Sequence, residues 1–173
     1  MQWKEPAHDR DWQTLLHLRH LYPHHSRKLW HALVNPELTR QYWAGTWQES
    51  DWAVGSSWRI MIPDGRVADS GEILEIDPPR RLVLSWTNEF KPELRGDGAS
   101  RLSYEIEQQE DMVKLTVTHE SNTPGSKLID AVSKGWPLIL ASLKSLLETG
   151  ASLEATRNWP EGRDCATRTP ARR

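Results

Sequence analysis

The feature that most constrains the fold of this chain is a change in the spacing of its apolar residues. From Ser57 to His119 apolar residues tend to alternate with polar ones, which is typical of strands with one buried face. From Ser126 to Thr149 they recur every three or four residues, which predicts one long amphipathic helix ending at Gly150. A sheet with one apolar face needs a helix to cover it. The sequence therefore predicts an α+β domain in which a curved antiparallel sheet wraps around the C-terminal helix.

Shorter patterns predict the remaining elements. About six or seven strands are expected, and the segments that carry the strand pattern are Thr14–Tyr22, Ser57–Ile62, Val67–Ile76, Leu82–Thr87, Leu102–Ile106 and Val113–His119. The first of these segments also fits a helix. Two short helices are expected after it, over residues 26–34 and 36–44. Gly71 inside a strand pattern indicates a bulge or bend, and Pro137 predicts a kink in the long helix near Ser133.

The length of 173 residues suits one domain. We expect a loose lead-in at residues 1–12, a single domain at 13–150, and a disordered tail at 151–173, where apolar periodicity is absent. The single cysteine, Cys165, excludes an intramolecular disulfide, and no segment is apolar enough for a signal peptide or a membrane span. A soluble cytoplasmic protein is the resulting expectation.

The net charge and the aromatic content of the chain indicate which classes of binding partner suit it. The chain has 22 Lys and Arg against 24 Asp and Glu, so its net charge of −2 disfavours binding to nucleic acid or to an anionic membrane surface. It has ten Trp but one Phe and three Tyr. Indole rings fill a core, or they line a cavity for an apolar guest while each N–H keeps a polar partner. Composition alone leaves both roles open.

Several sequence blocks, in a fixed order, resemble a known family. The blocks are KLWHALVNPELTRQYW, SDWAVGSSWRI, DGRVADSGEILEIDPPRRLVLSW, LTVTHE and GWPLILASLKSLLETG. From about Leu15 to Gly150 the chain resembles the START-like (SRPBCC, helix-grip) superfamily, in the subgroup of heat-shock-protein-90 ATPase activator homologues. In that subgroup the first helix often opens with Thr-Pro, where this chain has His25-Ser26. The resemblance implies a helix-grip fold with a cavity between sheet and long helix, and members that mostly bind small hydrophobic molecules.

Alternation and helical spacing place one set of side chains between the sheet and the long helix. The expected ligand-binding residues are Trp58, Ile60, Leu84, Trp86, Tyr104, Leu115, Val117, His119, Trp136 and Leu140. The same side chains also fit a close-packed core without a cavity. Desolvation should keep His119 neutral at pH 7. His119 is the candidate catalytic residue if the protein is an enzyme, and otherwise no catalytic residue is expected.

Neither a metal nor a cofactor is expected. Six of the seven histidines lie between His8 and His31, but the cluster of His20, His24 and His25 lacks the spacing of a zinc site. No nucleophile motif, Walker loop or dinucleotide fingerprint occurs. Together with the resemblance, this implies a small-molecule-binding protein with a role in stress response or regulation. The alternatives are an enzyme of polyketide-cyclase or hydratase type using the same cavity, and an interaction module for a chaperone or transcriptional regulator. A monomer and a homodimer both fit.

Overall fold

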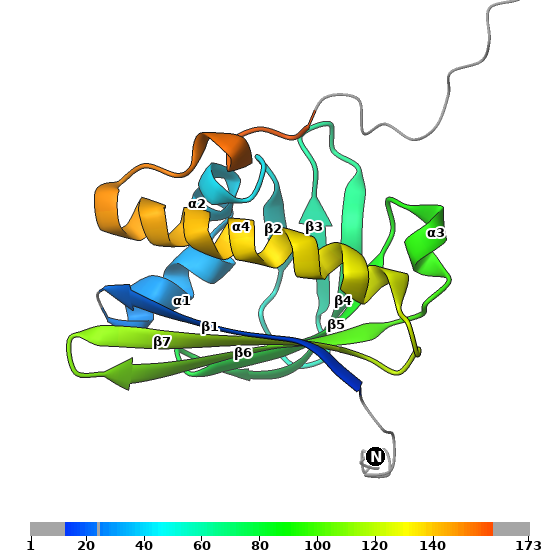
Figure 1. Cartoon of the computed structure of the whole chain (residues 1–173), viewed down its shortest axis with the longest axis horizontal. Helices are drawn as coiled ribbons and strands as arrows, with labels where there is room; N and C mark the ends of the chain where they lie inside the picture. Colours follow the sequence, from blue (N-terminus) through cyan, green and yellow to red (C-terminus); the bar gives the residue numbers. More distant parts are fainter. Residues whose placement is uncertain (1–12, 24, 161–173) are drawn as a thin grey trace, which may run out of the picture.

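The computed structural model describes residues 13–23 and 25–160, and it consists of a seven-stranded antiparallel sheet wrapped around one long helix (Figure 1). The strands are β1 (Gln13–Pro23), β2 (Trp47–Ser50), β3 (Ser57–Met61), β4 (Val67–Asp77), β5 (Arg81–Asn88), β6 (Ser100–Gln109) and β7 (Met112–Ser121), in the order β1-β7-β6-β5-β4-β3-β2. The helices are α1 (Ser26–Val34), α2 (Pro36–Tyr42), α3 (Pro92–Arg95), α4 (Lys127–Thr149) and the 3-10 turn η1 (Glu154–Thr156). The expected α+β helix-grip fold is confirmed.

Three short elements were not expected from the sequence: β2, α3, and η1 in the expected tail. Strand β2 is only four residues long, which is too short for alternation to be recognised. Helix α3 lies inside a segment that reads as a polar loop, and it begins at Pro92, a residue that favours the first helical turn. The first segment, for which strand and helix were both possible, is strand β1, and it pairs with β7 at the edge of the sheet.

Helix α4 is held at both ends by capping interactions. At its start Ser126 Oγ accepts a hydrogen bond from Ile129 N at 3.2 Å, and Asp97 Oδ2 accepts from Leu128 N at 2.8 Å. At its end Gly150 adopts the left-handed conformation with φ of 79°. The helix is continuous through Pro137, and the kink expected near Ser133 stays a prediction.

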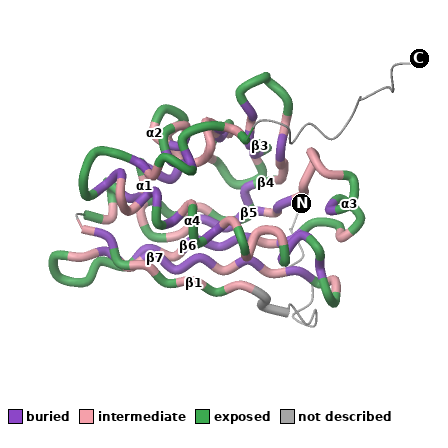
Figure 2. The backbone as a smooth tube through the Cα atoms, turned by 45° about the horizontal axis from the view of Figure 1, so that its top comes forward, coloured by how far each residue is buried: buried purple, intermediate pink, exposed green. Residues whose placement is uncertain are grey.

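The core lies between the concave face of the sheet and α4. Buried residues run along the strands beneath the helix, while the hairpin ends are exposed (Figure 2). Strands β4 and β5 approach closely at Gly71, where an added Cβ would lie 1.8 Å from the carbonyl oxygen of Ser85. The register shift of this strand pair lies nearby, between Ile73 and Glu75. The glycine therefore permits a close backbone approach beside the bulge.

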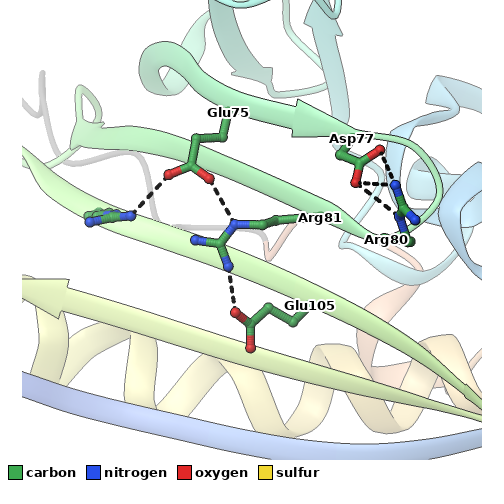
Figure 3. A network of polar contacts seen from close by, with 6 residues as sticks. Glu75, Asp77, Arg80, Arg81 and Glu105 are labelled. Atoms are coloured by element: carbon green, nitrogen blue, oxygen red, sulfur yellow. Dashed lines mark hydrogen bonds and ion pairs between the residues drawn. The ribbon is translucent and has the colours of Figure 1, made fainter.

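Ion pairs cover the outer face of the sheet. Arg81 contacts Glu75 through Nε at 2.8 Å and Glu105 through Nη1 at 2.5 Å, and Asp77 pairs with Arg80 at the β4–β5 turn (Figure 3). These side chains keep substantial solvent exposure, so each pair contributes little to the free energy of folding. The pairs show that Glu75, Asp77 and Glu105 point away from α4.

Residues 151–160 fold back over the domain, so the expectation of a disordered tail is wrong for this part of it. Thr156 O accepts a hydrogen bond from Ala44 N at 2.7 Å, and Thr156 Oγ1 lies 2.5 Å from Ser142 Oγ. Ser142 Oγ also accepts from Leu153 N at 3.1 Å. These anchors are hydroxyl and backbone groups, which leave no apolar periodicity in the sequence. The rest of the expected tail, 161–173, and the lead-in, 1–12, lie outside the described residues, and the domain limits stay a prediction.

Within the described ranges, no helix combines the length and apolar character needed to cross a bilayer.

Candidate functional site

A pocket of about 210 Å³ opens between the first half of α4 and the β3–β4–β5 end of the sheet. Its aromatic lining consists of Trp43, Trp86, Phe90, Trp136 and Trp159. Helix α4 adds apolar side chains, among them those of Ala131, Val132 and Ile139. The polar lining residues are Thr46, Asp69, Asn88 and Lys91. The combination of apolar walls and a few polar groups is typical of small-molecule sites.

Three indoles from different elements meet in the wall of this pocket. Trp43, which follows α2, stacks on Trp86 of β5 with ring centroids 6.3 Å apart and an interplanar angle of 22°. Trp136 of α4 approaches Trp43 edge-on at 5.2 Å and Trp86 at 6.1 Å. Such offset and edge-to-face pairs are favourable arrangements of aromatic rings. The wall is therefore built by tertiary packing and not by one element.

The segment after α4 supplies a further part of the wall. Trp159 packs edge-on against Phe90 with centroids 5.5 Å apart, and both rings line the pocket. The segment is held near this position by the hydrogen bonds of Thr156 to Ala44 and Ser142. The residues that the sequence assigned to a tail thus complete the pocket.

Asp69 is the ionisable acid of the pocket lining. Its Oδ1 accepts hydrogen bonds from Trp86 Nε1 at 2.9 Å and Asn88 Nδ2 at 2.7 Å. Burial raises the pKa of Asp69 to about 6, although the hydrogen bonds from Asn88 and Trp86 lower it in part. The charge of Glu89 raises this pKa further. Asp69 therefore changes its protonation state much closer to neutral pH than an ordinary carboxyl group.

Sequence reasoning missed Asp69 because of a β-bulge. Ile60 pairs with Asp69 and Met61 pairs with Val67, which leaves Ala68 as an extra residue on β4. A bulge re-aims the side chains beside it. Ala68 and Asp69 consequently both line the pocket, whereas strict alternation would send one of them to the outer face. No residue in this stretch signals a bulge in the sequence.

The structure places the expected site residues in two groups. Ile60, Trp86 and Trp136 line the pocket. The others are buried outside the pocket lining; they are Trp58, Leu84, Tyr104, Leu115, Val117, His119 and Leu140. Most of the expected site residues are therefore buried beside the pocket and do not line it. Phe90 and Trp159 were missed because they lie outside the periodic segments, whereas Trp43 was expected inside the second short helix and lies just beyond its end at Tyr42.

His119 does not line the pocket, but it contacts a residue of the pocket wall, Trp136. Its Nε2 lies 2.8 Å from Ser100 Oγ, and its Nδ1 accepts a hydrogen bond from Trp136 Nε1 at 3.3 Å. Ser100 Oγ donates to Trp86 O, so it is free to accept from His119 Nε2–H. Burial lowers the pKa of His119 to about 3, which keeps the ring neutral at pH 7. Both ring nitrogens are occupied, and the imidazole holds Trp136 in place.

Metal ligands do not gather in the part of the chain that the structure describes: no three side chains of His, Cys, Asp or Glu come together there. His24, one member of the histidine cluster noted in the sequence, lies outside the described residues.

Comparison with known proteins places the chain among proteins of the same fold. The family model described as "Activator of Hsp90 ATPase homolog 1-like protein" matches residues 23–148. CalU16 from Micromonospora echinospora is 22% identical over 78% of this chain and 76% of its own, with a TM-score of 0.62. Protein MLL2253 from Mesorhizobium loti is 22% identical over 77% and 96%, with a TM-score of 0.66. PFC0360w, an HSP90 activator from Plasmodium falciparum, is 21% identical over 76% and 94%, with a TM-score of 0.60. No curated protein matches the chain.

Proposed function

Because the chain belongs to the family of Activator of Hsp90 ATPase homolog 1-like proteins, we propose that its helix-grip fold serves to bind a small hydrophobic or aromatic molecule. The observation that carries this proposal is the aromatic-walled pocket between α4 and the sheet. A role in stress response or regulation, and a cytoplasmic location, belong to the same proposal.

The size of the pocket limits the ligand. Drug-sized ligands occupy pockets of roughly 300–1,000 Å³, and this pocket has about 210 Å³. We therefore expect a guest with one or two rings. If such a guest buried about 200 Å² of apolar surface, the transfer free energy would be about 5 kcal/mol. The entropic cost of association offsets part of this gain, so high-micromolar to millimolar affinity is expected unless polar groups contribute.

Intrinsic tryptophan fluorescence provides the direct test. The pocket wall contains four of the ten Trp residues, namely Trp43, Trp86, Trp136 and Trp159. A guest that enters should quench or shift their emission along a saturable curve. A panel of small aromatic and aliphatic compounds that produces no saturable change would overturn the proposal.

Gly135 offers a way to block the pocket without disturbing the core. It lines the pocket from α4, and a Cβ added there meets no atom within 4 Å. A Gly135→Leu side chain should therefore occupy the space meant for a guest and lower affinity at least about tenfold, the loss of roughly 1.4 kcal/mol. The matched control is Gly135→Ala, which should keep affinity within about twofold because one methyl group fills little of the pocket.

Both variants should fold at least as stably as the wild type, since Gly inside a helix costs about 1 kcal/mol relative to Ala. Unchanged affinity in a well-folded Gly135→Leu protein would place the binding site elsewhere.

An enzyme is the second candidate, and Asp69 favours it. A carboxyl group with a pKa of about 6 in an apolar pocket can accept and return a proton near neutral pH, as general acid–base catalysis requires. An enzyme of polyketide-cyclase or hydratase type would use Asp69 in place of His119, which does not line the pocket. Turnover of a bound compound that disappears in Asp69→Asn would support this candidate.

No cluster of exposed apolar side chains favours the interaction module among the described residues. The exposed large apolar residues are Leu21, Val54, Leu74 and Leu138, and they lie on β1, the β2–β3 loop, β4 and α4. A chaperone partner, suggested by the likeness to PFC0360w, therefore stays a prediction, as does the choice between monomer and homodimer.

A further inference from the structure

The carboxylate of Asp69 has no cationic partner among the described residues. Its Oδ1 accepts from two neutral donors, Trp86 Nε1 and Asn88 Nδ2. Its Oδ2 accepts no hydrogen bond there and is not among the fully buried unpartnered atoms, so it keeps some accessible surface in a residue that lines the pocket. Buried charges in proteins are normally paired, because an unpaired charge loses its hydration without compensation. The missing partner is the first indication of what the pocket holds.

The neighbouring charges do not replace that partner. Glu89 carries a second negative charge close to Asp69, and it is itself bound by Ser70 Oγ at 2.7 Å and by Arg95 at 3.3 Å. Lys91 is the cationic side chain of the lining, and it forms no ion pair with Asp69. Asp69 is therefore the acid of the lining that has no cationic partner among the described residues.

The walls around this carboxylate also suit a cation. The faces of indole and phenyl rings carry negative electrostatic potential, and a cation over such a face is attracted most strongly when both are desolvated. Trp43, Trp136, Phe90 and Trp159 line the same space as Asp69. Aromatic walls around one acidic group are the arrangement by which proteins recognise ammonium groups.

We propose that the pocket selects guests that carry a protonated amine on a small aromatic or apolar body, with the ammonium donating to Asp69 Oδ2. The body then lies against the indole walls. This inference rests on the proposed binding function and names the ligand class of that same pocket. A neutral hydroxyl could also donate to Asp69, but a hydrogen bond between two charged groups is roughly twice as strong as a neutral one.

The test uses three probes that share one body and differ in the head group: phenethylamine, 2-phenylethanol and 3-phenylpropionate. Their affinities are measured by calorimetry with the full chain at pH 7.5. Phenethylamine should bind about tenfold or more tightly than the alcohol, as expected for a hydrogen bond between charged groups. The carboxylate should bind most weakly because Asp69 and Glu89 repel it.

Two matched variants locate the effect. Asp69→Asn keeps the shape of the side chain and removes its charge, so the amine should lose about tenfold in affinity while the alcohol changes less than about threefold. Glu89→Gln removes a nearby charge from a residue outside the lining and should leave the preference for the amine in place. An amine preference that survives in Asp69→Asn overturns the inference.

Acid pH gives an independent check that needs no variant. The pKa of Asp69 is about 6, so at pH 5 the carboxyl group is mostly protonated and the preference for the amine over the alcohol should largely disappear. A preference that is the same at pH 5 and pH 7.5 contradicts the assignment.

The possible outcomes distinguish failure of the amine selectivity from failure of the proposed small-molecule binding. Equal binding of all three probes would leave the proposed function standing and overturn the amine selectivity. Binding of none of them, nor of any other small compound, would overturn both. A preference for the amine that appears only in Lys91→Gln would show that Lys91 pairs with Asp69 in the wild type, which also overturns the inference.

Discussion

At the scale of single residues, Trp86 links the pocket to the core. Its indole N–H donates to Asp69, and its ring lies 4.8 Å from that of Trp58 and 5.3 Å from that of His119. Its backbone oxygen accepts from Ser100 Oγ, the hydroxyl that also contacts His119. The pocket carboxyl group and the buried imidazole therefore depend on the same side chain, although only one of them faces the pocket.

The two hydrogen bonds of the His119 ring predict how much stability the protein loses when the ring nitrogens are removed. In His119→Phe the ring volume is largely kept, but Trp136 Nε1 loses its acceptor and Ser100 Oγ loses a partner in a buried setting. An unsatisfied buried polar group costs about 1–3 kcal/mol, so we expect a loss of about 2 kcal/mol in the free energy of unfolding. Urea denaturation measures this loss.

A comparable loss is expected for Ser100→Ala, because the bond between Trp136 and His119 stays but His119 Nε2–H loses its buried acceptor. A His119→Phe protein as stable as the wild type would contradict this account of the network.

The sequence allowed prediction of site residues where periodicity applied and failed where it was interrupted. Trp86 and Trp136, chosen because one alternates along a strand and the other follows a helical period, both line the pocket, and their contact with a ligand stays a prediction. Asp69 was missed because a bulge changes the direction of its side chain. Trp43 and Trp159 follow the ends of helical segments, where the pattern no longer constrains direction. Their positions depend on tertiary contacts that no local pattern encodes.

At the scale of elements, the long helix and the sheet could be predicted from the sequence. The contacts that fix the start of α4 and the segment after it could not. The Gly150 end of α4 follows from the local sequence. The hydrogen bond from Leu128 N holds the pKa of Asp97 below its ordinary value, and Asp97 reaches the start of α4 from the loop after α3. Such a distant cap leaves no signal in the helix sequence. The same applies to the segment after α4, which is anchored by hydroxyl groups.

That segment should be essential to the pocket wall. Thr156→Val keeps the shape of a buried side chain but removes its hydrogen bonds to Ser142 Oγ and to Leu153 O. We expect a loss of about 1–2 kcal/mol in stability, the scale of one or two net hydrogen bonds. Because Trp159 depends on this anchor, affinity for 2-phenylethanol should also fall. Urea denaturation and calorimetry measure the two effects.

The matched control is Thr87→Val on β5, where no hydrogen bond of the hydroxyl occurs among the described residues, and this change should alter stability by less than about 0.5 kcal/mol. Wild-type affinity in a Thr156→Val protein would mean that the segment is not needed for the pocket.

At the scale of the whole molecule, buried His119 and half-buried Asp69 affect stability in opposite directions. The pKa of His119 falls by burial from 6.5 to about 3, so between these values the unfolded chain binds more protons and acidification destabilises the fold. The pKa of Asp69 rises by burial from 3.8 to about 6, so between these values the folded chain binds more protons and acidification stabilises it. Each group alone changes stability by up to about 1.4 kcal/mol per pH unit. The carboxyl group needed in the pocket therefore costs stability at neutral pH.

This opposition gives the last prediction, which concerns stability between pH 7 and pH 4. Asp69→Asn removes the group that is destabilising when ionised, so at pH 7 this protein should exceed the wild type by about 2 kcal/mol. Below pH 6 the wild type regains stability through protonation of Asp69 and the variant does not, so the difference should shrink as the pH falls. His119→Phe should start less stable and lose less on acidification than the wild type. Urea denaturation of the three proteins at matched pH values measures these differences, in which the other titrating groups cancel. Curves that stay parallel from pH 7 to pH 4 would mean that neither group has the shifted pKa on which the acid–base behaviour of the pocket depends.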